Sequence, residues 1–359
     1  MGAGYDETGK LEQVFARIER LVSDGETDAA ALAVGVAGQP VAAWYAGHAR
    51  PELPAGPHVY WPLASISKLY TAATVMALVE RGELYLSLPV HLVLPEFAGD
   101  GSDRRDAITL RQLLTHTSGL LYESPNMEEL LIDQTPLDAL IAEGQQYPLD
   151  HAPGSAHQYS DYGFALLGKV AATVTGVPFP ELVRSLVLEP AGLQHTSLQP
   201  APEWFPFIAQ APGAFGWGTD GAMYNSPYAL RLGHPAFGVV ATLADLLRFG
   251  LLFANRGMLD GYRVLSRSTV RAMTSNHVSI PGAPAWGLGF ELDAAASGEG
   301  DLLGPGSFGH GGATGCTLWH DSSAEITIAF VSNRHYNLNP VSFARRLSIA
   351  TNGVLAALT

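Results

Sequence analysis

The 359-residue chain has one cysteine, few lysines and a deficit of positive charge. Cys316 cannot form an internal disulfide, and no cysteine and histidine cluster has zinc-ligand spacing, so we predict no metal site. Lysine and arginine number 20 against 34 aspartate and glutamate, which gives a formal net charge of -14. Such a surface repels phosphate backbones and anionic membranes, so we expect neither a nucleic-acid partner nor a membrane partner.

The chain also lacks long apolar runs. No stretch of 18 residues is both apolar and uncharged, as a membrane-spanning helix requires. The amino terminus is polar, without the apolar segment of a signal peptide, and Asp6 stands where a myristoylation signal has serine or threonine. These features predict a cytoplasmic protein. The 47% hydrophobic content excludes a mainly disordered chain, and the length favours two domains or one domain with a large insertion.

The pattern of apolar residues predicts a sheet built from both chain ends and a helical middle. Predicted helices cover 9–24, 65–82, 108–115, 126–143, 162–174, 179–187, 242–254 and 340–357, with Thr242 as a helix cap; a hairpin covers 29–46, strands cover 286–292, 314–321 and 325–333, and 204–238 is an aromatic loop. We therefore predict an α/β (α+β) fold. Residues 1–82 and 236–359 would form an α/β domain, and 83–235 a mainly helical inserted subdomain, with a cleft between them.

Ser65 and Lys68 lie three residues apart at the start of an apolar predicted helix. Because three residues is nearly one turn, the hydroxyl and the amine share a face, whereas Ser67 lies about 200° round the helix from Ser65. No charged residue follows Lys68 until Glu80. Burial disfavours an ammonium, which makes Lys68 a candidate proton acceptor for a serine nucleophile. A helix-capping Ser65 and a snorkelling Lys68 are the alternative interpretation.

A serine nucleophile also needs a base and donors for an oxyanion. Tyr159 lies just before a predicted helix, and a phenol near an ammonium can be shifted toward phenolate, which is a competent base. His310, Gly311 and Gly312 precede a predicted strand, where small residues let a substrate lie against the backbone. We expect edge-strand amides there to complete an oxyanion hole.

Together these segments resemble the serine β-lactamase and penicillin-binding protein superfamily, in its class C-like branch of esterases and related hydrolases. Residues 65–68 (SISK) resemble the family's Ser-x-x-Lys, residues 159–161 (YSD) its Tyr-x-Asn, and residues 310–312 (HGG) its Lys-Thr-Gly, which is often His-x-Gly in the esterase branch. The resemblance covers nearly the whole chain. It implies a β-lactamase/transpeptidase-like fold, with a central, mostly antiparallel sheet flanked by helices.

The resemblance also implies roles for these residues. Ser65 would attack, Lys68 and Tyr159 would manage its proton, and the backbone amides of Ser65 and Ala313 would hold the oxyanion. The resulting acyl-enzyme is then hydrolysed. Tyr159 would protonate the leaving group and later activate water.

Two departures from the family pattern carry consequences. Asp161 replaces the amide that orients the lysine and the acyl side chain, and its charge would raise the affinity of Lys68 for a proton, so Tyr159 must do more of the base work. Asp161 is also a candidate N-cap for the helix that follows. His310 replaces a lysine and so removes a fixed positive charge, which predicts that penicillin-like acids are poorer substrates.

Other residues are given more modest roles. We expect His116 to hydrogen-bond the backbone at a helix end and Cys316 to be a small buried hydrophobe. Ser307, in Pro-Gly-Ser-Phe-Gly, fails the first position of the Gly-x-Ser-x-Gly elbow, which argues against an α/β-hydrolase. The aromatic segment from Trp204 to Tyr224 is equally well explained as a wall of the acyl pocket and as packed core.

The favoured function is a serine hydrolase that acts through an acyl-enzyme on Ser65, as a carboxylesterase for small neutral esters. The expected partner is a small-molecule ester or amide, and no cofactor is expected. One alternative is a β-lactamase or a D-amino acid amidase or peptidase of the same fold, which an export signal would favour. The other is a catalytically idle binding protein, against which the intact Ser65, Lys68 and Tyr159 argue.

Overall fold

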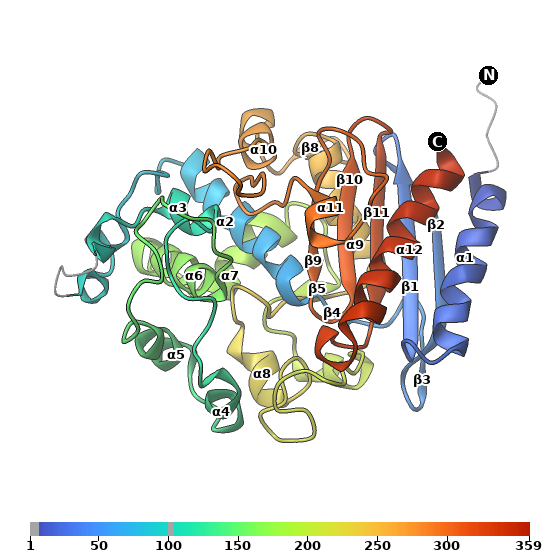
Figure 1. Cartoon of the computed structure of the whole chain (residues 1–359), viewed down its shortest axis with the longest axis horizontal. Helices are drawn as coiled ribbons and strands as arrows, with labels where there is room; N and C mark the ends of the chain where they lie inside the picture. Colours follow the sequence, from blue (N-terminus) through green and yellow to red (C-terminus); the bar gives the residue numbers. More distant parts are fainter. Residues whose placement is uncertain (1–6, 100–103) are drawn as a thin grey trace.

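A six-stranded antiparallel sheet joins the two ends of the chain in the computed structural model, which describes residues 7–99 and 104–359 (Figure 1). Asp6 lies outside the described residues. The strand order is β3-β2-β1-β11-β10-β9. The strands are β1 (Ala29–Val36), β2 (Gln39–Arg50), β3 (Leu53–Pro54), β9 (Phe308–Gly312), β10 (Cys316–Asp321) and β11 (Ile326–Ser332).

Strand β1 is apolar throughout because both of its faces are buried. Ala30, Leu32 and Val34 face one apolar cluster, and the alternate residues Ala31 and Ala33 face the other. Its neighbour β11 pairs with it in register, with Leu32 opposite Phe330. A two-faced core of this kind explains why the segment reads as a continuous apolar run rather than as an alternating one.

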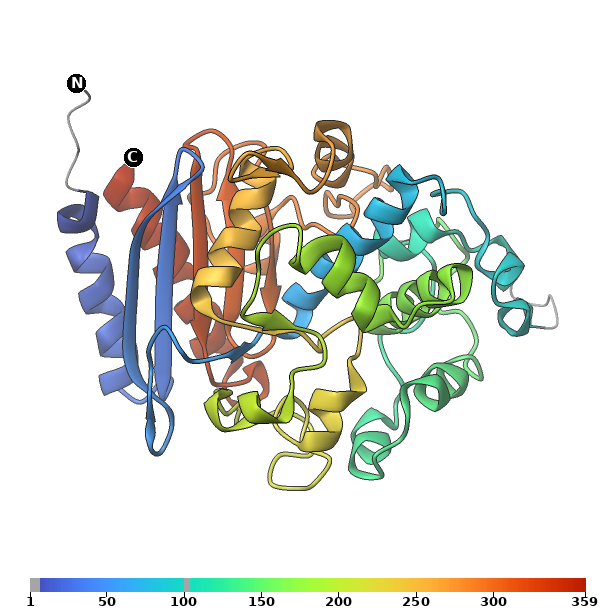
Figure 2. The same cartoon turned by 180° about the vertical axis from the view of Figure 1, so that it is seen from behind.

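The terminal helices cover one face of the sheet, and α9 covers the other. Helix α1 (Glu7–Ser23) packs against α12 (Pro340–Leu358), and the two bury apolar side chains against β1 and β11. Helix α9 (Leu243–Ala254) contacts the opposite side of the same strands, as Figure 2 shows from behind. Its predicted cap is confirmed, since Thr242 Oγ1 accepts from the Asp245 amide.

Helix α2 (Ser67–Glu80) follows the one-turn 3-10 helix η1 (Ala64–Ile66) and is buried on all sides along most of its length. It packs against α6 (Asp161–Thr175), α7 (Phe179–Val183) and the π-turn η5 (Arg184–Leu188). The other helices are α3 (Leu110–Leu114), α4 (Met127–Ile132), α5 (Leu137–Gly144), α8 (Pro227–Leu232), α10 (Arg267–Met273) and α11 (Ala294–Ser297), the last of which contacts β9. The short strands are β4 (Trp61–Pro62), β5 (Thr196–Ser197), β6 (Val240–Ala241), β7 (Met258–Leu259) and β8 (Tyr262–Arg263). The remaining 3-10 turns are η2 (Val90–Leu92), η3 (Pro95–Ala98), η4 (Arg105–Ala107), η6 (Pro202–Phe207) and η7 (Tyr336–Leu338).

The predicted fold class is confirmed, but one predicted strand is wrong. Residues 286–292 make only isolated bridges, because Gly289 has a φ of 90° and the Gly287 amide turns back to Phe290. The strand that completes the sheet is β9, which carries His310 within it. The segment predicted to precede a strand is therefore itself the edge strand.

Two helical predictions also need correction. The helix predicted over 126–143 is split into α4 and α5. Pro136, which stands just before α5, cannot continue a helix and has an extended backbone conformation. The segment 204–238 is not all loop. It includes α8, which begins with Ser226 as N-cap and Pro227 in the first helical position.

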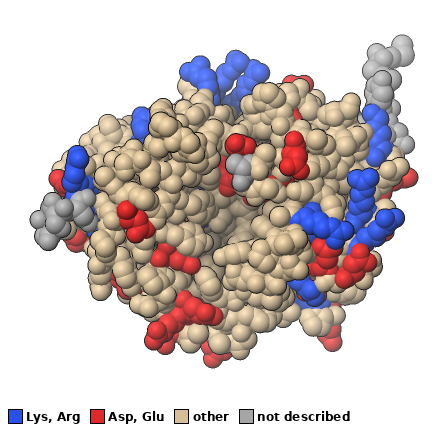
Figure 3. Space-filling view, in the orientation of Figure 1, with Lys and Arg blue, Asp and Glu red and all other residues tan. Residues whose placement is uncertain are grey.

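Figure 3 shows a hollow near the middle of one face, in the part where the start of α2 lies beside β9 in Figure 1, and the lysines and arginines lie toward the edges of this face.

The predicted domain boundaries at 82/83 and 235/236 stay predictions. Among the described residues, no single helix is long and apolar enough to cross a bilayer; α6 and Phe179–Leu188 pass on length and composition only as a pair bent by 85°.

Candidate active site

Ser65 sits in the short turn η1, directly against the end of β9. Ala64, the residue before it, has a φ of 45°, a left-handed conformation that costs energy for a residue with a side chain. Gly312 closes on this turn from β9, because an added Cβ there would collide with the Leu63 carbonyl. The missing side chain at Gly312 thus lets the backbone after β9 approach Ser65 closely.

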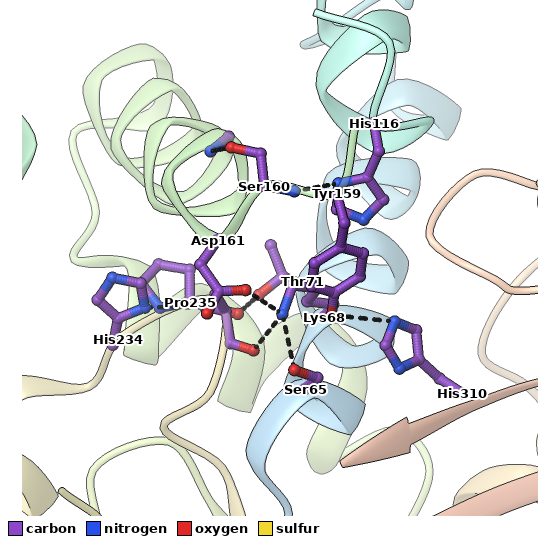
Figure 4. Close-up of polar contacts among 12 residues, drawn as sticks. Ser65, Lys68, Thr71, His116, Tyr159, Ser160, Asp161, His234, Pro235 and His310 are labelled. Carbon is purple, nitrogen blue, oxygen red and sulfur yellow. Dashed lines mark hydrogen bonds and ion pairs between the residues drawn. The ribbon is translucent and has the colours of Figure 1, made fainter. Parts of the chain in front are cut away.

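Lys68 is fully buried, and its amine is surrounded by oxygen atoms (Figure 4). Nζ lies 3.1 Å from Ser65 Oγ, 3.2 Å from the Ala236 carbonyl and 2.6 Å from Asp161 Oδ1. Three acceptors match the three N–H groups of an ammonium. Burial lowers the pKa of Lys68, while the charge of Asp161 opposes that change. The predicted meeting of the Ser65 hydroxyl and the Lys68 amine on one face is present.

Tyr159 reaches the same point from the loop before α6. Lys68 Nζ lies 4.6 Å from the centre of its ring, and the His116 ring stacks on it with 4.3 Å between ring centroids. Burial and the charge of Asp161 raise the pKa of Tyr159 well above its usual value, and a hydrogen bond with Ser65 opposes the rise. Tyr159 is therefore a phenol at rest, and the predicted shift toward phenolate beside the ammonium is wrong.

His310 faces Tyr159 from β9 and is buried. Its Nδ1 lies 2.6 Å from the Gly311 carbonyl, which can only accept, so Nδ1 carries the proton. Burial lowers the pKa of His310 to about 3, with the nearby Lys68 charge adding to the effect. The neutral ring therefore presents an unprotonated Nε2 to the Tyr159 hydroxyl, 3.4 Å away.

The N-cap of α6 is Ser160, so the prediction that Asp161 caps this helix is wrong. Ser160 Oγ accepts from the Gly163 amide and donates to the Leu121 carbonyl. Asp161 points instead to Lys68, with its side chain 5% exposed. Burial raises the pKa of Asp161, and the Lys68 charge opposes that rise.

Contacts around this centre bear on three further predictions. His116 bonds a backbone group, but not at the end of its own helix as predicted: its Nδ1 accepts from the Ser160 amide and so fixes the loop that carries Tyr159. Ser67 Oγ accepts from the Val239 amide, and the serine hydroxyl that meets Lys68 Nζ is that of Ser65, as predicted. Cys316 is fully buried.

The aromatic segment divides between two surroundings. Trp204 stacks on Tyr60, with 4.3 Å between centroids, which is a packing contact. Tyr224 is buried beside His335, whose ring also contacts Tyr336. The Tyr336 amide donates to the Ala313 carbonyl and so ties this group to the end of β9. For Tyr224, a place in the acyl pocket stays a prediction.

Two buried carboxyl groups, Glu291 and Glu299, lie near β9, and the sequence patterns do not predict either. Glu291 Oε1 lies 3.8 Å from His310 Nδ1, and Glu299 accepts hydrogen bonds from β10. Burial raises the pKa of Glu291 well above its usual value and that of Glu299 to about 7. The only signal in the sequence was a charged residue within the apolar stretch WGLGFEL, and Glu299 gave none.

The comparisons with known proteins point in one direction. The Beta-lactamase family model matches residues 14–351. Protein Rv1367c of Mycobacterium tuberculosis is 30% identical over 345 residues, covering 82% of this chain and 82% of its own. Among solved structures, "EstCE1, a hydrolase with promiscuous acyltransferase activity" has a TM-score of 0.76 at 22% identity, covering 94% of this chain and 98% of its own. A class C beta-lactamase has a TM-score of 0.78 at 22% identity, covering 99% and 100%.

Proposed function

The chain belongs to the Beta-lactamase family, and from that premise we propose that it is a carboxylesterase that forms an acyl-enzyme on Ser65 and acts on small neutral esters. The observation that carries the proposal is the cluster of Ser65, Lys68 and Tyr159. Their reactive groups come from η1, from α2 and from the loop before α6, and they meet beside the end of β9.

In the first step, the Ser65 oxygen attacks the ester carbonyl. The Lys68 ammonium donates to Oγ and stabilises negative charge as it develops there. Since Tyr159 is a phenol, it can take the Ser65 proton only by passing its own proton on. The unprotonated Nε2 of His310 lies 3.4 Å from the Tyr159 oxygen and can hold this proton only transiently, because burial disfavours the charged ring, until the alkoxy group takes it.

The tetrahedral intermediate needs donors for its oxyanion, and the amides of Ser65 and Ala313 are the proposed pair. Collapse of the intermediate breaks the bond to the alkoxy group, which takes back a proton through Tyr159 and leaves as an alcohol. In the second step the same groups remove a proton from water, which attacks the acyl-enzyme. Release of the acid returns a proton to Ser65.

Charge favours a neutral ester over a carboxylate-bearing substrate. His310 is neutral where a lysine would supply a fixed positive charge, and Asp161 places a carboxylate beside Lys68. The lysines and arginines of the hollowed face lie toward its edges (Figure 3). Desolvating a substrate carboxylate among these groups is costly unless a cation pairs with it.

Hydrolysis of a β-lactam, or of an amide that ends in a D-residue, is the alternative for the same machinery. It is favoured by the likeness to a class C beta-lactamase over nearly the whole chain. An idle binding protein is the third hypothesis, and it predicts no covalent adduct at all.

The test has two stages. A fluorophosphonate probe should raise the intact mass of the wild-type protein by one adduct on the peptide that contains Ser65, and Ser65→Ala should abolish the adduct. Ser67→Ala, which removes the neighbouring hydroxyl, serves as a control that should still react. Wild-type protein should then hydrolyse 4-nitrophenyl acetate faster than nitrocefin or D-alanine 4-nitroanilide. Labelling that survives Ser65→Ala rejects the mechanism, and ester turnover no faster than the other two rejects the carboxylesterase.

A further inference from the structure

Glu299 is a buried carboxyl group that the proposed reaction leaves without a role. It follows α11 and is 5% exposed. Its Oε2 accepts from Thr317 Oγ1 at 2.7 Å and from Trp319 Nε1 at 2.8 Å. Both donors belong to β10, so one oxygen holds two alternate residues of that strand.

The other oxygen of Glu299 lies against β9. An added Cβ at Gly311 would collide with Glu299 Oε1, which means that the carboxyl group fills the space a side chain would occupy. Side chains alternate along a strand, so Gly311 faces away from the side on which His310 meets Tyr159. Glu299 thus supports β9 from behind the candidate active site.

The register places this support at the level of the reacting groups. Thr317 pairs with Gly311 and Trp319 pairs with Gly309, so the two donors flank His310 along the ladder. Strand β9 ends at Gly312, which lies close to the turn that carries Ser65.

We infer that Glu299 is a positioning residue, which fixes β9 against β10 from behind and thereby sets where the backbone from Gly311 to Ala313 lies relative to Ser65. This inference rests on the proposed function, because it matters for catalysis only if the Ala313 amide binds an oxyanion. Glu299 touches no reacting atom and acts through the strand.

The surroundings of Glu299 explain why its charge would matter too. The charges of Glu299 and of Asp293, which lies on the same segment as Glu291, both raise the pKa of Glu291. Glu291 in turn faces His310 on β9. The charge of Lys68 on α2 and a hydrogen bond with Ser297 of α11 both act to lower the pKa of Glu291. The groups of β10 that face Glu299 are uncharged hydrogen-bond donors. When Glu299 ionises, a negative charge appears behind amides that must stabilise an oxyanion, so ionisation should slow the reaction.

The experiment compares Glu299→Ala and Glu299→Gln with the wild-type protein. Glutamine keeps an oxygen that can accept from Thr317 and Trp319 but cannot ionise, whereas alanine removes both. Asp321→Ala is the matched control, because Asp321 is another buried carboxylate that accepts several hydrogen bonds, at the far end of β10. For each variant kcat, KM, Tm and the rate of fluorophosphonate labelling are measured.

We expect Glu299→Ala to lower kcat and the labelling rate by at least about tenfold with KM changed less than about twofold, and Glu299→Gln to restore most of the loss. Asp321→Ala should lower Tm without this change in kcat. The ratio of wild-type to Glu299→Gln kcat/KM should fall as pH rises through about 7, where Glu299 ionises.

A Glu299→Ala protein that labels and turns over at the wild-type rate overturns the inference, and so does a loss in proportion to Tm that Asp321→Ala reproduces. A ratio of wild-type to Glu299→Gln activity that does not change with pH rejects the part played by charge. If wild-type Ser65 does not react with the phosphonate, the proposed function fails, and the two failures are thereby distinguished.

Discussion

Lys68 and Asp161 form an ion pair with 2.6 Å between Nζ and Oδ1, and their side chains are 0% and 5% exposed. Burial alone would push both groups toward their neutral forms. The charge of each group opposes this effect on the other, and Nζ has two further acceptors, in Ser65 and Ala236, which also favour the ammonium. The residue that departs from the family pattern at position 161 is thus one that favours the protonated form of Lys68.

Asp161→Asn tests this relationship through the pH dependence of the reaction. Removal of the carboxylate should lower the pKa of Lys68, because its charge opposes the effect of burial. If the Lys68 ammonium is needed to stabilise the attacking oxygen, the alkaline limb of the kcat/KM profile should move to lower pH. An unchanged alkaline limb would show that the charge of Lys68 does not govern the rate.

Asp161→Ala tests the same pair through stability. It leaves a buried ammonium without its carboxylate and should lower the free energy of unfolding by about 3 kcal/mol or more. Asp161→Asn should lose less, since the amide oxygen can still accept from Nζ. Urea denaturation of the two variants measures the difference, and equal losses would contradict the ion pair as the stabilising contact.

The parts of the site that helix geometry determines could be predicted from the sequence. Residues three apart on a helix share a face, so the contact between Ser65 and Lys68 follows from their spacing. The partner of Asp161 could not be predicted in this way. Ser160 and Asp161 are both good N-caps, and what decides between them is the nearby Lys68, which belongs to a different helix.

Strand β9 shows why the sheet edge was harder to predict. Its sequence FGHGG has three glycines and no β-branched residue, so its intrinsic strand propensity is low. It forms a strand because β10 pairs with it along its whole length. The place of Glu299 depends on the same pairing, since a loop residue becomes buried only where a strand without side chains leaves room for it.

His310→Lys should change which substrates are preferred. A lysine at this position would add the positive charge that neutral His310 does not supply. We expect the rate with nitrocefin, which carries a carboxylate, to rise about tenfold relative to that with 4-nitrophenyl acetate, which corresponds to about 1.4 kcal/mol. His310→Gln is the neutral control and should leave this ratio near its wild-type value. A ratio that fails to rise with lysine would show that charge at this position does not select the substrate.

Ser160→Ala should reduce both stability and activity. The buried hydroxyl caps α6 at the Gly163 amide and satisfies the Leu121 carbonyl, so its removal should cost about 2 kcal/mol of unfolding free energy. Ser266→Ala removes the N-cap of α10 and is the matched control. Both variants should lose stability, but only Ser160→Ala should lower kcat, because the residues on either side of Ser160 contact Lys68. Equal kcat values in the two variants would show that the N-cap of α6 does not affect the reaction at the candidate active site.

Acid should destabilise the protein partly through His234. Its side chain is buried, its Nδ1 accepts from the Ala236 amide, and burial lowers its pKa to about 3 from an ordinary value of 6.5. Between these values the unfolded chain binds a proton that the folded chain does not. The stability that His234 contributes is therefore present above pH 6.5 and is lost as pH falls toward 3, by about 1 kcal/mol per pH unit.

His234→Asn isolates this effect from the buried carboxyl groups. Burial raises the pKa values of Asp161 and Glu291, so these two groups contribute the opposite slope, with stability rising as pH falls toward their unfolded values. The difference in unfolding free energy between wild type and His234→Asn removes their common contribution. This difference, measured by urea denaturation from pH 7 to pH 4, should shrink as pH falls. A difference that stays constant over that range would mean that His234 is protonated in the folded protein as readily as in the unfolded chain.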